Sequence, residues 1–151
     1  MLKDKIQDDL KGAMMAKDAA RLSAIRMLKT AIQYYEIQKG GAGYEATDED
    51  VIDVIGKEIK KRKESIELYK QGGREESAAS EQKEVEILES YLPEQMSEDE
   101  VRSLVREAIE QTGASSISEM GKVMGALIPK VKGKADGTLV SNLVREELSN
   151  S

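Results

Sequence analysis

The sequence predicts an all-α protein, made of an N-terminal four-helix unit and a small three-helix tail domain. Three observations lead to this prediction. Apolar residues recur at helical spacing along most of the chain, and no stretch alternates in the way that a strand does. The helical pattern also stops at Pro93 and starts again after it. We therefore expect two domains, residues 1–93 and 94–151.

Apolar spacing and glycine define the first two helices. Asp18 is a suitable N-cap for the second helix. The run 40–43, Gly-Gly-Ala-Gly, ends that helix, because glycine disfavours helix and suits left-handed turns. The apolar positions are Leu2, Ile6, Leu10 and Ala13 in the first helix, and Leu22, Ile25, Leu28, Ile32 and Tyr35 in the second.

The next two helices complete the N-terminal unit. Thr47 and Asp50 form a near capping box at the start of the third helix, with Asp in place of Glu. The fourth is expected from about Glu75 to Leu92, where Pro93 closes it, because the residue before a proline is disfavoured in helical geometry. The apolar positions are Val51, Ile55, Ile59, Ile66 and Tyr69 in the third helix, and Ala78, Val85 and Leu88 in the fourth.

The tail repeats the pattern in three shorter helices. Ser97 and Glu100 form a capping box before the first, Gly113 stops it, and Asp136 caps the last. A Lys/Gly-rich loop is expected between the last two helices. The apolar positions are Val101, Leu104, Val105, Ala108 and Ile109, then Met120, Val123, Met124, Leu127 and Ile128, and then Leu139, Val140, Leu143, Val144 and Leu148.

Composition excludes several kinds of chemistry. Histidine and cysteine are absent, so the chain has no Ser–His or Cys–His pair and lacks the usual zinc ligands. Paired carboxylates and a Ser–Lys arrangement remain open. We expect a protein without catalytic residues, cofactor or metal.

The same composition bears on location. No window approaches the roughly 18 apolar residues that a membrane span needs, and the first ten residues, MLKDKIQDDL, lack the apolar core of a secretory signal. Without cysteine there is no disulfide framework. We expect a cytoplasmic protein with no membrane partner.

Charge is distributed unevenly. The chain carries a net charge of −6, but residues 120–151 hold 5 basic and 3 acidic side chains, which gives +2 against −8 for the remainder. The one basic stretch is therefore the C-terminal end, where an anionic partner would be attracted.

Two features of this basic stretch are candidates for binding. Gly121 and Gly125 lie in a predicted helix, where each costs about 0.8–1 kcal/mol relative to alanine. They indicate either tight helix packing within the tail or a bare face on which an RNA backbone or a partner docks. Lys130, Lys132 and Lys134 form either a solvated basic loop or an anion contact next to a helix N-terminus that Asp136 partly neutralises.

Charged residues also interrupt the apolar stripes of the N-terminal unit. Arg26, Arg62 and Glu81 all fall in register with apolar neighbours. They are expected to form a buried or half-buried Arg–Glu network that holds the helices in register, although such pairs add little net stability. A charged ligand pocket is the alternative interpretation.

The third predicted helix carries a mixed charge run. Lysines at 57, 60, 61 and 63 and Arg62 are interleaved with Glu58, Glu64 and Glu67, which is typical of a solvated, salt-bridged face. An RNA-facing surface is the other possibility. With five tyrosines and no phenylalanine the chain lacks a stacking platform for single strands, so RNA contacts would be to backbone and shape.

Taken together, these residues resemble the YqeY-like protein family, and the C-terminal part resembles the tail domain of the GatB subunit of glutamyl/aspartyl-tRNA amidotransferase. The similarity covers nearly the whole chain. The residues that carry it are Arg21, Ile25-Arg26, Leu28, Lys57-Glu58, Lys61-Arg62, Glu64-Ser65, Gly73-Arg74, Glu81, Glu84, Tyr91-Leu92-Pro93, Met120-Gly121-Lys122-Val123-Met124-Gly125 and Ala135-Asp136-Gly137.

The resemblance implies a helical N-terminal unit followed by a three-helix tail that contacts tRNA, with Lys122, Lys130, Lys132 and Lys134 as candidate contacts. The leading hypothesis is a non-catalytic accessory protein that binds tRNA or a tRNA-handling enzyme, such as a tRNA-dependent amidotransferase or synthetase. One alternative is a protein–protein adaptor that acts through the N-terminal unit. A carbon–nitrogen ligase with glutamine as amido-N-donor follows from kinship only.

Overall fold

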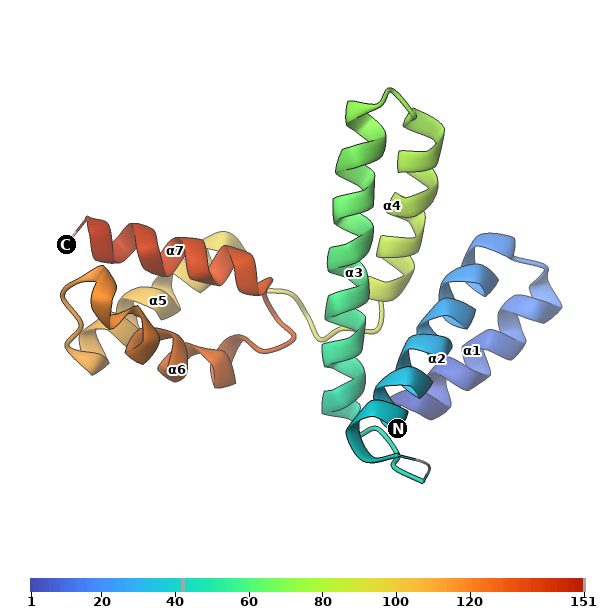
Figure 1. Cartoon of the computed structure of the whole chain (residues 1–151), viewed down its shortest axis with the longest axis horizontal. Coiled ribbons are helices and arrows are strands. Elements are labelled where there is room, and N and C mark those ends of the chain that lie inside the picture. Colours follow the sequence, from blue (N-terminus) through green and yellow to red (C-terminus); the bar gives the residue numbers. More distant parts are fainter. Residues whose placement is uncertain (42, 151) are drawn as a thin grey trace. The chain divides into compact units, whose positions relative to one another are not determined.

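The computed structural model describes residues 1–41 and 43–150, so Ala42, in the expected glycine-rich turn, and Ser151 lie outside the described residues. The described residues form seven α-helices and one short 3₁₀ turn, with no strand, which confirms the all-α prediction (Figure 1). The elements are α1 (Leu2–Ala16), α2 (Ala19–Gly40), α3 (Asp48–Gln71), α4 (Glu75–Glu89), α5 (Glu98–Thr112), η1 (Ile117–Glu119), α6 (Met120–Val131) and α7 (Gly137–Ser149).

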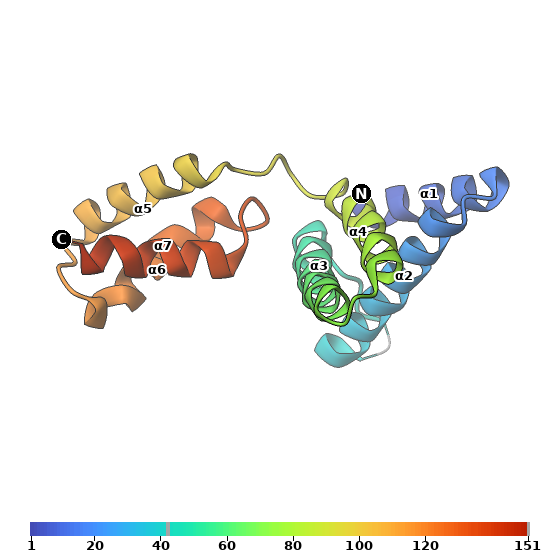
Figure 2. The same cartoon turned by 90° about the horizontal axis from the view of Figure 1, so that it is seen from above.

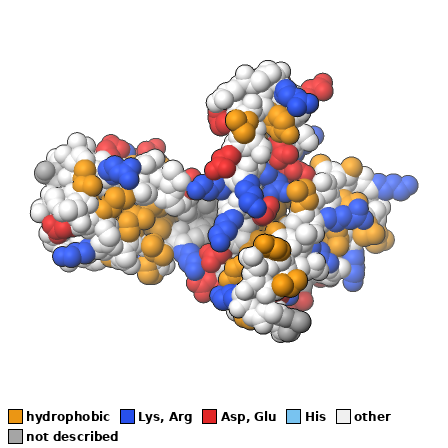
Figure 3. Space-filling view, viewed as in Figure 1, with side chains coloured by type: hydrophobic (Ala, Val, Ile, Leu, Met, Phe, Trp, Pro, Cys, Tyr) orange, Lys and Arg blue, Asp and Glu red, His pale blue; other side chains and the backbone are white. Residues whose placement is uncertain are grey.

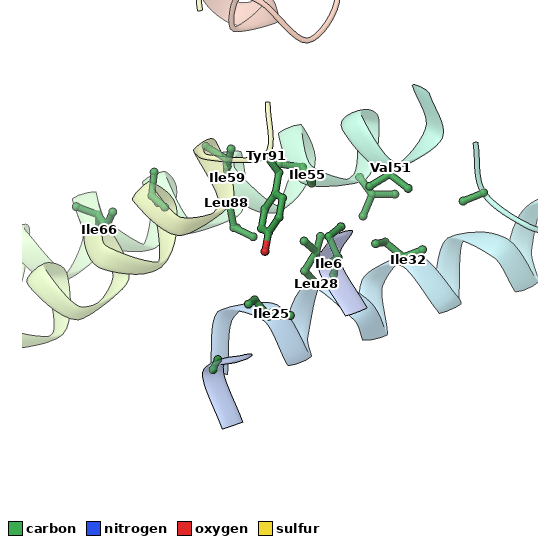
Figure 4. Packing of buried hydrophobic residues seen from close by; sticks show 14 of the residues in the cluster. Ile6, Ile25, Leu28, Ile32, Val51, Ile55, Ile59, Ile66, Leu88 and Tyr91 are labelled. Carbon is green, nitrogen blue, oxygen red and sulfur yellow. The ribbon is translucent and has the colours of Figure 1, made fainter. Parts of the chain in front are cut away.

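The chain divides into two compact units, Met1–Leu92 and Pro93–Ser151. In the first, α1 and α2 form one helical hairpin and α3 and α4 form another (Figures 1 and 2). Isoleucine and leucine side chains from all four helices meet between the hairpins, and the ring of Tyr91 lies among them (Figure 4). This core includes Ile6, Ile25, Leu28, Ile55 and Leu88, each of which is almost completely buried.

The second unit has a separate core. It is made from one apolar stripe on each of α5, α6 and α7. The fully buried side chains include Val101 and Val105 of α5, Val123 and Leu127 of α6, and Val144 of α7. Two independent cores are what the interrupted sequence pattern indicates.

Most of the predicted caps are present. The carboxylate of Asp18 accepts from the amide of Arg21 at 3.2 Å, and that of Asp136 accepts from the amide of Thr138 at 3.2 Å. Thr47 and Asp50 form the complete reciprocal box. At Ser97 the hydroxyl accepts from the amide of Glu100 at 3.2 Å, which is the half of the predicted box that the structure records.

Two helix boundaries and one additional element differ from the prediction. Helix α4 ends at Glu89, and residues 90–92 continue as turns. Pro93 disfavours helix at Leu92, as expected, but it also has no N–H to donate to the carbonyl of Glu89, four residues earlier. Helix α6 continues through Pro129 to Val131, so Lys130 lies on a helix and not in a loop. The 3₁₀ turn η1 was not predicted, since three residues are too few to show a period.

A buried carboxylate closes the α2–α3 connection. Asp50 accepts hydrogen bonds from the hydroxyl of Tyr44 at 2.6 Å and the hydroxyl of Tyr35 at 2.9 Å. It also accepts from the amide of Thr47, and the ammonium of Lys39 lies 3.4 Å from it. The Tyr44 hydroxyl, the Thr47 amide and the other donors lower the pKa of Asp50 well below its ordinary value.

Among the helices within the described part of the chain, none is long and apolar enough to cross a membrane.

Candidate nucleic-acid interface

One side of α6 is bare. The helix buries Val123, Leu127 and Val131 against the rest of its unit. At 3.6 residues per turn, Gly121, Gly125 and the residues around them lie on the opposite side. Both glycines are exposed. The outward face of α6, as we call it, consists of Gly121, Lys122, Gly125, Pro129 and the adjoining Lys132.

The glycines of this face are not explained by packing. A Cβ built on Gly121 or Gly125 would meet no described atom within 4 Å, so neither position needs glycine for a close approach inside the unit. The interpretation of tight internal packing is therefore wrong. The helix-propensity cost of the two glycines, about 1.6–2 kcal/mol together, is not offset by contacts within the described chain.

Pro129 lies on the same face. Pro129 follows Gly125 by four residues within α6 and has no N–H. The Gly125 carbonyl therefore lacks the donor that an α-helix normally provides at that position. The outward face of α6 thus combines two exposed glycines with an exposed proline.

Lysines flank the bare face. Lys122 and Lys134 are exposed, and no carboxylate of the described residues lies within ion-pair distance of either ammonium. Lys130 is 3.9 Å from Glu107 of α5, a long pair between two exposed side chains that leaves the lysine accessible. Lys132 is exposed at the C-cap of α6. All four predicted contact lysines therefore lie on the surface of the second unit.

The loop after α6 is held in place. The amide of Met96 donates to the carbonyl of Lys134 at 2.8 Å, and the side chain of Gln95 donates to the carbonyl of Gly133 at 2.8 Å. Gly133 has φ 74°, a left-handed conformation that suits glycine. These bonds fix the backbone that carries Lys134 while its side chain remains exposed.

The arginines of α5 are neutralised. Arg102 contacts the carboxylates of Glu146 and Glu147 at 3.2 and 3.1 Å, and Arg106 contacts Glu147 at 3.1 Å. The two guanidinium groups lower the pKa of Glu147 through hydrogen bonds. Glu146 and Glu147, which would otherwise repel an anion, are thus paired with arginines between α5 and α7.

The charge network of the first unit differs from the predicted one. Arg62 is 5% exposed and contacts Glu58 of its own helix at 3.0 Å and Glu84 of α4 at 3.4 Å. Arg26 is exposed, because α2 buries Ile25 and Leu28 and turns position 26 outward. Glu81 is half-buried beside this network, and burial, followed by repulsion from Glu84, raises its pKa.

Sequence reasoning missed Glu58 and Glu84 as the partners of Arg62. Both are spaced at helical intervals from buried positions, so a search for opposite charges on facing stripes could have found them. The hydroxyl of Ser23 in α2 also donates to Glu84 at 3.2 Å, so the network joins α2, α3 and α4. This position supports the expected role of holding these helices in register.

The structure thus defines an all-helical protein of two compact units, with a bare helix face flanked by lysines in the smaller unit. The chain belongs to the YqeY-like protein family, whose family model matches residues 3–148.

Curated relatives share a mitochondrial name. The protein "Altered inheritance of mitochondria protein 41, mitochondrial" of Pyrenophora tritici-repentis is 32% identical over 145 residues, which are 94% of this chain and 78% of the relative. Its namesake in Saccharomyces cerevisiae is 36% identical over 87 residues, or 58% of this chain and 46% of the relative. That of Lachancea thermotolerans is 38% identical over 88 residues, with the same coverage. The aligned part is less than half the length of the two yeast relatives.

These relatives correct the expected location. We expected a cytoplasmic protein, and the similarity to proteins named as mitochondrial contradicts this. The inference failed because absent cysteines and absent apolar windows exclude disulfides and membrane spans but do not distinguish among compartments.

Proposed function

We propose that this protein is a non-catalytic accessory protein that binds tRNA through the Pro93–Ser151 unit. The observation that carries the proposal is the outward face of α6, where Gly121 and Gly125 expose backbone that nothing in the described chain covers. Without side chains at these two positions, a partner can approach the backbone of α6 more closely than it could approach a helix that carries side chains there. Lys122, Lys132 and Lys134 lie beside this bare backbone and suit a partner with phosphates.

The chemistry of the face favours an RNA backbone. Phosphate oxygens attract the lysines, and the exposed glycines let an RNA strand approach the helix backbone closely. Stacking on splayed bases is not supported, because the unit has no aromatic side chain. The resemblance of this unit to the GatB tail supports tRNA as the particular RNA.

Titration of labelled tRNA against the full chain at several salt concentrations tests the proposal. Three or four lysine–phosphate contacts from this unit contribute about −2 to −3.6 to the slope of log K against log salt. The variant K122E/K134E is expected to lose most of this binding. The matched control K11E/K83E changes two exposed lysines of the first unit by the same charge and is expected to bind normally. Absence of binding at low salt, or binding that is equal in K122E/K134E and wild type, removes the proposal.

A second candidate function is that of a protein–protein adaptor acting through the Met1–Leu92 unit. The observation in its favour is an apolar row on the exposed side of α2, where Met27, Tyr34 and Ile37 are 52%, 63% and 65% exposed. Exposed apolar patches of this kind mark interaction sites. Partner capture that is abolished by M27S/Y34S/I37S but preserved in K122E/K134E would favour the adaptor over the tRNA-binding protein.

The amide-forming ligase, which rests on kinship alone, has a direct test. A nucleophile activated by histidine or a cysteine thiolate cannot exist in this chain, which has neither residue. We expect no turnover when the purified chain is incubated with glutamine, ATP and tRNA. Measurable release of glutamate or ADP would restore the enzyme hypothesis.

A further inference from the structure

We infer that the first unit contacts the phosphate backbone of the same RNA through a second surface, on the outer side of α3. This α3 basic face consists of Gly56, Lys57, Lys60 and Lys61. The inference rests on the proposed tRNA-binding function and extends it from one unit to both.

Helix geometry places these residues together. Helix α3 buries Ile55, Ile59 and Arg62 against the rest of its unit. Gly56 and Lys60 are four residues apart and Lys57 and Lys60 three apart, so all three lie side by side on the opposite surface. All are exposed, and Lys61 adjoins them with 74% of its side chain accessible. Lys and Arg side chains gather over the middle of α3 in the space-filling view, with acidic side chains nearby (Figure 3).

The ion pairs of α3 leave this face positive. Within the described chain, no carboxylate is within ion-pair distance of the ammonium of Lys57 or Lys60, although Glu64 lies four residues after Lys60. Lys61 is 3.5 Å from Glu58, but Glu58 also contacts the buried Arg62 at 3.0 Å. One carboxylate is thus shared between two cations. The expected solvated, salt-bridged face is therefore present at Lys61 and Lys63, which pair with Glu58 and Glu89, but not, among the described residues, at Lys57 and Lys60.

Acidic residues bound the face along the helix. Glu64 and Glu67 are exposed beyond Lys60, toward the C-terminal end of α3. Asp53 lies four residues before Lys57, so acidic residues at both ends restrict the positive surface to about two helical turns, a length of roughly 10 Å. A surface of that length can contact one or two phosphates of an RNA strand, and it is too short to bind an extended stretch of nucleic acid.

Gly56 has no structural reason to be glycine. It lies in the interior of a 24-residue helix, is exposed, and a Cβ on it would meet no described atom within 4 Å. It occupies the position next to Lys57 and Lys60, where a phosphate between the two lysines would approach the helix backbone. Helix α6 presents the same combination at Gly121, Lys122 and Gly125: an exposed glycine within a helix, next to a lysine that forms no ion pair with the described residues.

This repetition favours RNA over an acidic protein surface. A protein helix can pack closely on a bare backbone, but such packing needs apolar contacts around the glycine, and the neighbours of Gly56 on this face are lysines. A phosphodiester strand carries its charge close to its own backbone, so a missing side chain lets it come nearer. Two such surfaces on two separately folded units suit one extended polyanion that contacts both.

The experiment uses the full chain, labelled bulk tRNA and the variants K57Q/K60Q, G56Q and K122E/K134E, with K11E/K83E as the control. Glutamine has a helix propensity similar to that of lysine, and it removes the positive charge without introducing a negative one. We expect K57Q/K60Q to flatten the slope of log K against log salt by about 1.4–1.8 and to weaken binding at 0.1 M salt by roughly tenfold or more. We expect G56Q, a helix-favouring change, to raise the melting temperature and yet weaken tRNA binding.

The variants separate this inference from the proposed function. Weakened binding in both K57Q/K60Q and K122E/K134E supports both. Unchanged binding and salt slope in K57Q/K60Q, with loss in K122E/K134E, overturns the α3 inference and leaves the tail function standing. Loss in K57Q/K60Q alone supports the α3 surface and overturns the tail function. Wild-type chain that binds no tRNA, or K57Q/K60Q that loses only an acidic protein partner, overturns the inference.

Discussion

The hydroxyl of Tyr91 donates a 2.6 Å hydrogen bond to the carboxylate of Asp9, which joins residues 82 positions apart in the sequence. Tyr91 is buried in the turn after α4, and its ring contributes to the core between the two hairpins (Figure 4). Burial, and then the bond to Asp9, raise the pKa of the Tyr91 hydroxyl. The bond ties the last turn of the first unit to α1, directly before the chain enters the second unit.

We expect Tyr91→Phe to destabilise the first unit by about 1–2 kcal/mol, because a hydrogen bond to a charged group is lost while the ring stays in place. Urea unfolding followed by circular dichroism measures the change. The variant D9N keeps an acceptor and should lose less. Equal stability of Y91F and wild type would show that the bond adds nothing to the fold.

We expect Arg62→Met to lower the free energy of unfolding by about 3 kcal/mol or more. The loss arises because Glu58 and Glu84 stay half-buried without their shared cation. The triple variant R62M/E58Q/E84Q removes the uncompensated charges and should recover most of the stability. If R62M alone is as stable as wild type in equilibrium unfolding, the network is dispensable.

We expect Glu81→Gln to stabilise the protein at neutral pH. The pKa of Glu81 is raised in the folded state, so the stability that its protonated form contributes is complete below the unfolded pKa of about 4.3 and is lost as pH rises through the folded pKa. The amide mimics the protonated form at every pH. Melting temperatures of E81Q and wild type should therefore differ most near pH 7 and converge in acid; a constant difference would contradict this.

We expect Asp50→Asn to remove part of the acid sensitivity of the first unit. The pKa of Asp50 is lowered in the folded state, so its contribution to stability is present above the unfolded pKa of about 3.9 and disappears as pH falls below it. Wild type should be more stable than D50N at pH 7, and the gap should narrow below about pH 4. Parallel pH profiles of the two proteins would show that Asp50 is not responsible.

We expect the double variant G121A/G125A to gain about 1.6–2 kcal/mol of stability, because alanine is the better helix former and both positions face open space. Its tRNA affinity should fall, since two methyl groups now cover the bare backbone. Thermal unfolding and tRNA titration of one preparation give both readouts. Greater stability with unchanged affinity would mean that the glycines do not contact the RNA.

Much of the fold follows from the sequence. The helical period shows which residues of each helix face inward, and glycine, proline and capping side chains show where helices begin and end. These are local effects within a turn or two of the chain, so they are readable without knowing what packs where. The caps at Asp18, Thr47 and Asp136 are cases in which the local prediction holds.

The tertiary structure decided the rest, because burial and charge pairing depend on neighbours that are distant in sequence. A spacing of four residues placed Arg26 on the apolar stripe, yet each such step rotates by 40°, and packing turned Arg26 outward. The choice of Glu58 and Glu84 as partners of Arg62 needed the actual approach of α3 and α4. The sequence alone determined that glycines and lysines share the tail; only the packed unit shows that the glycines of α6 face open space.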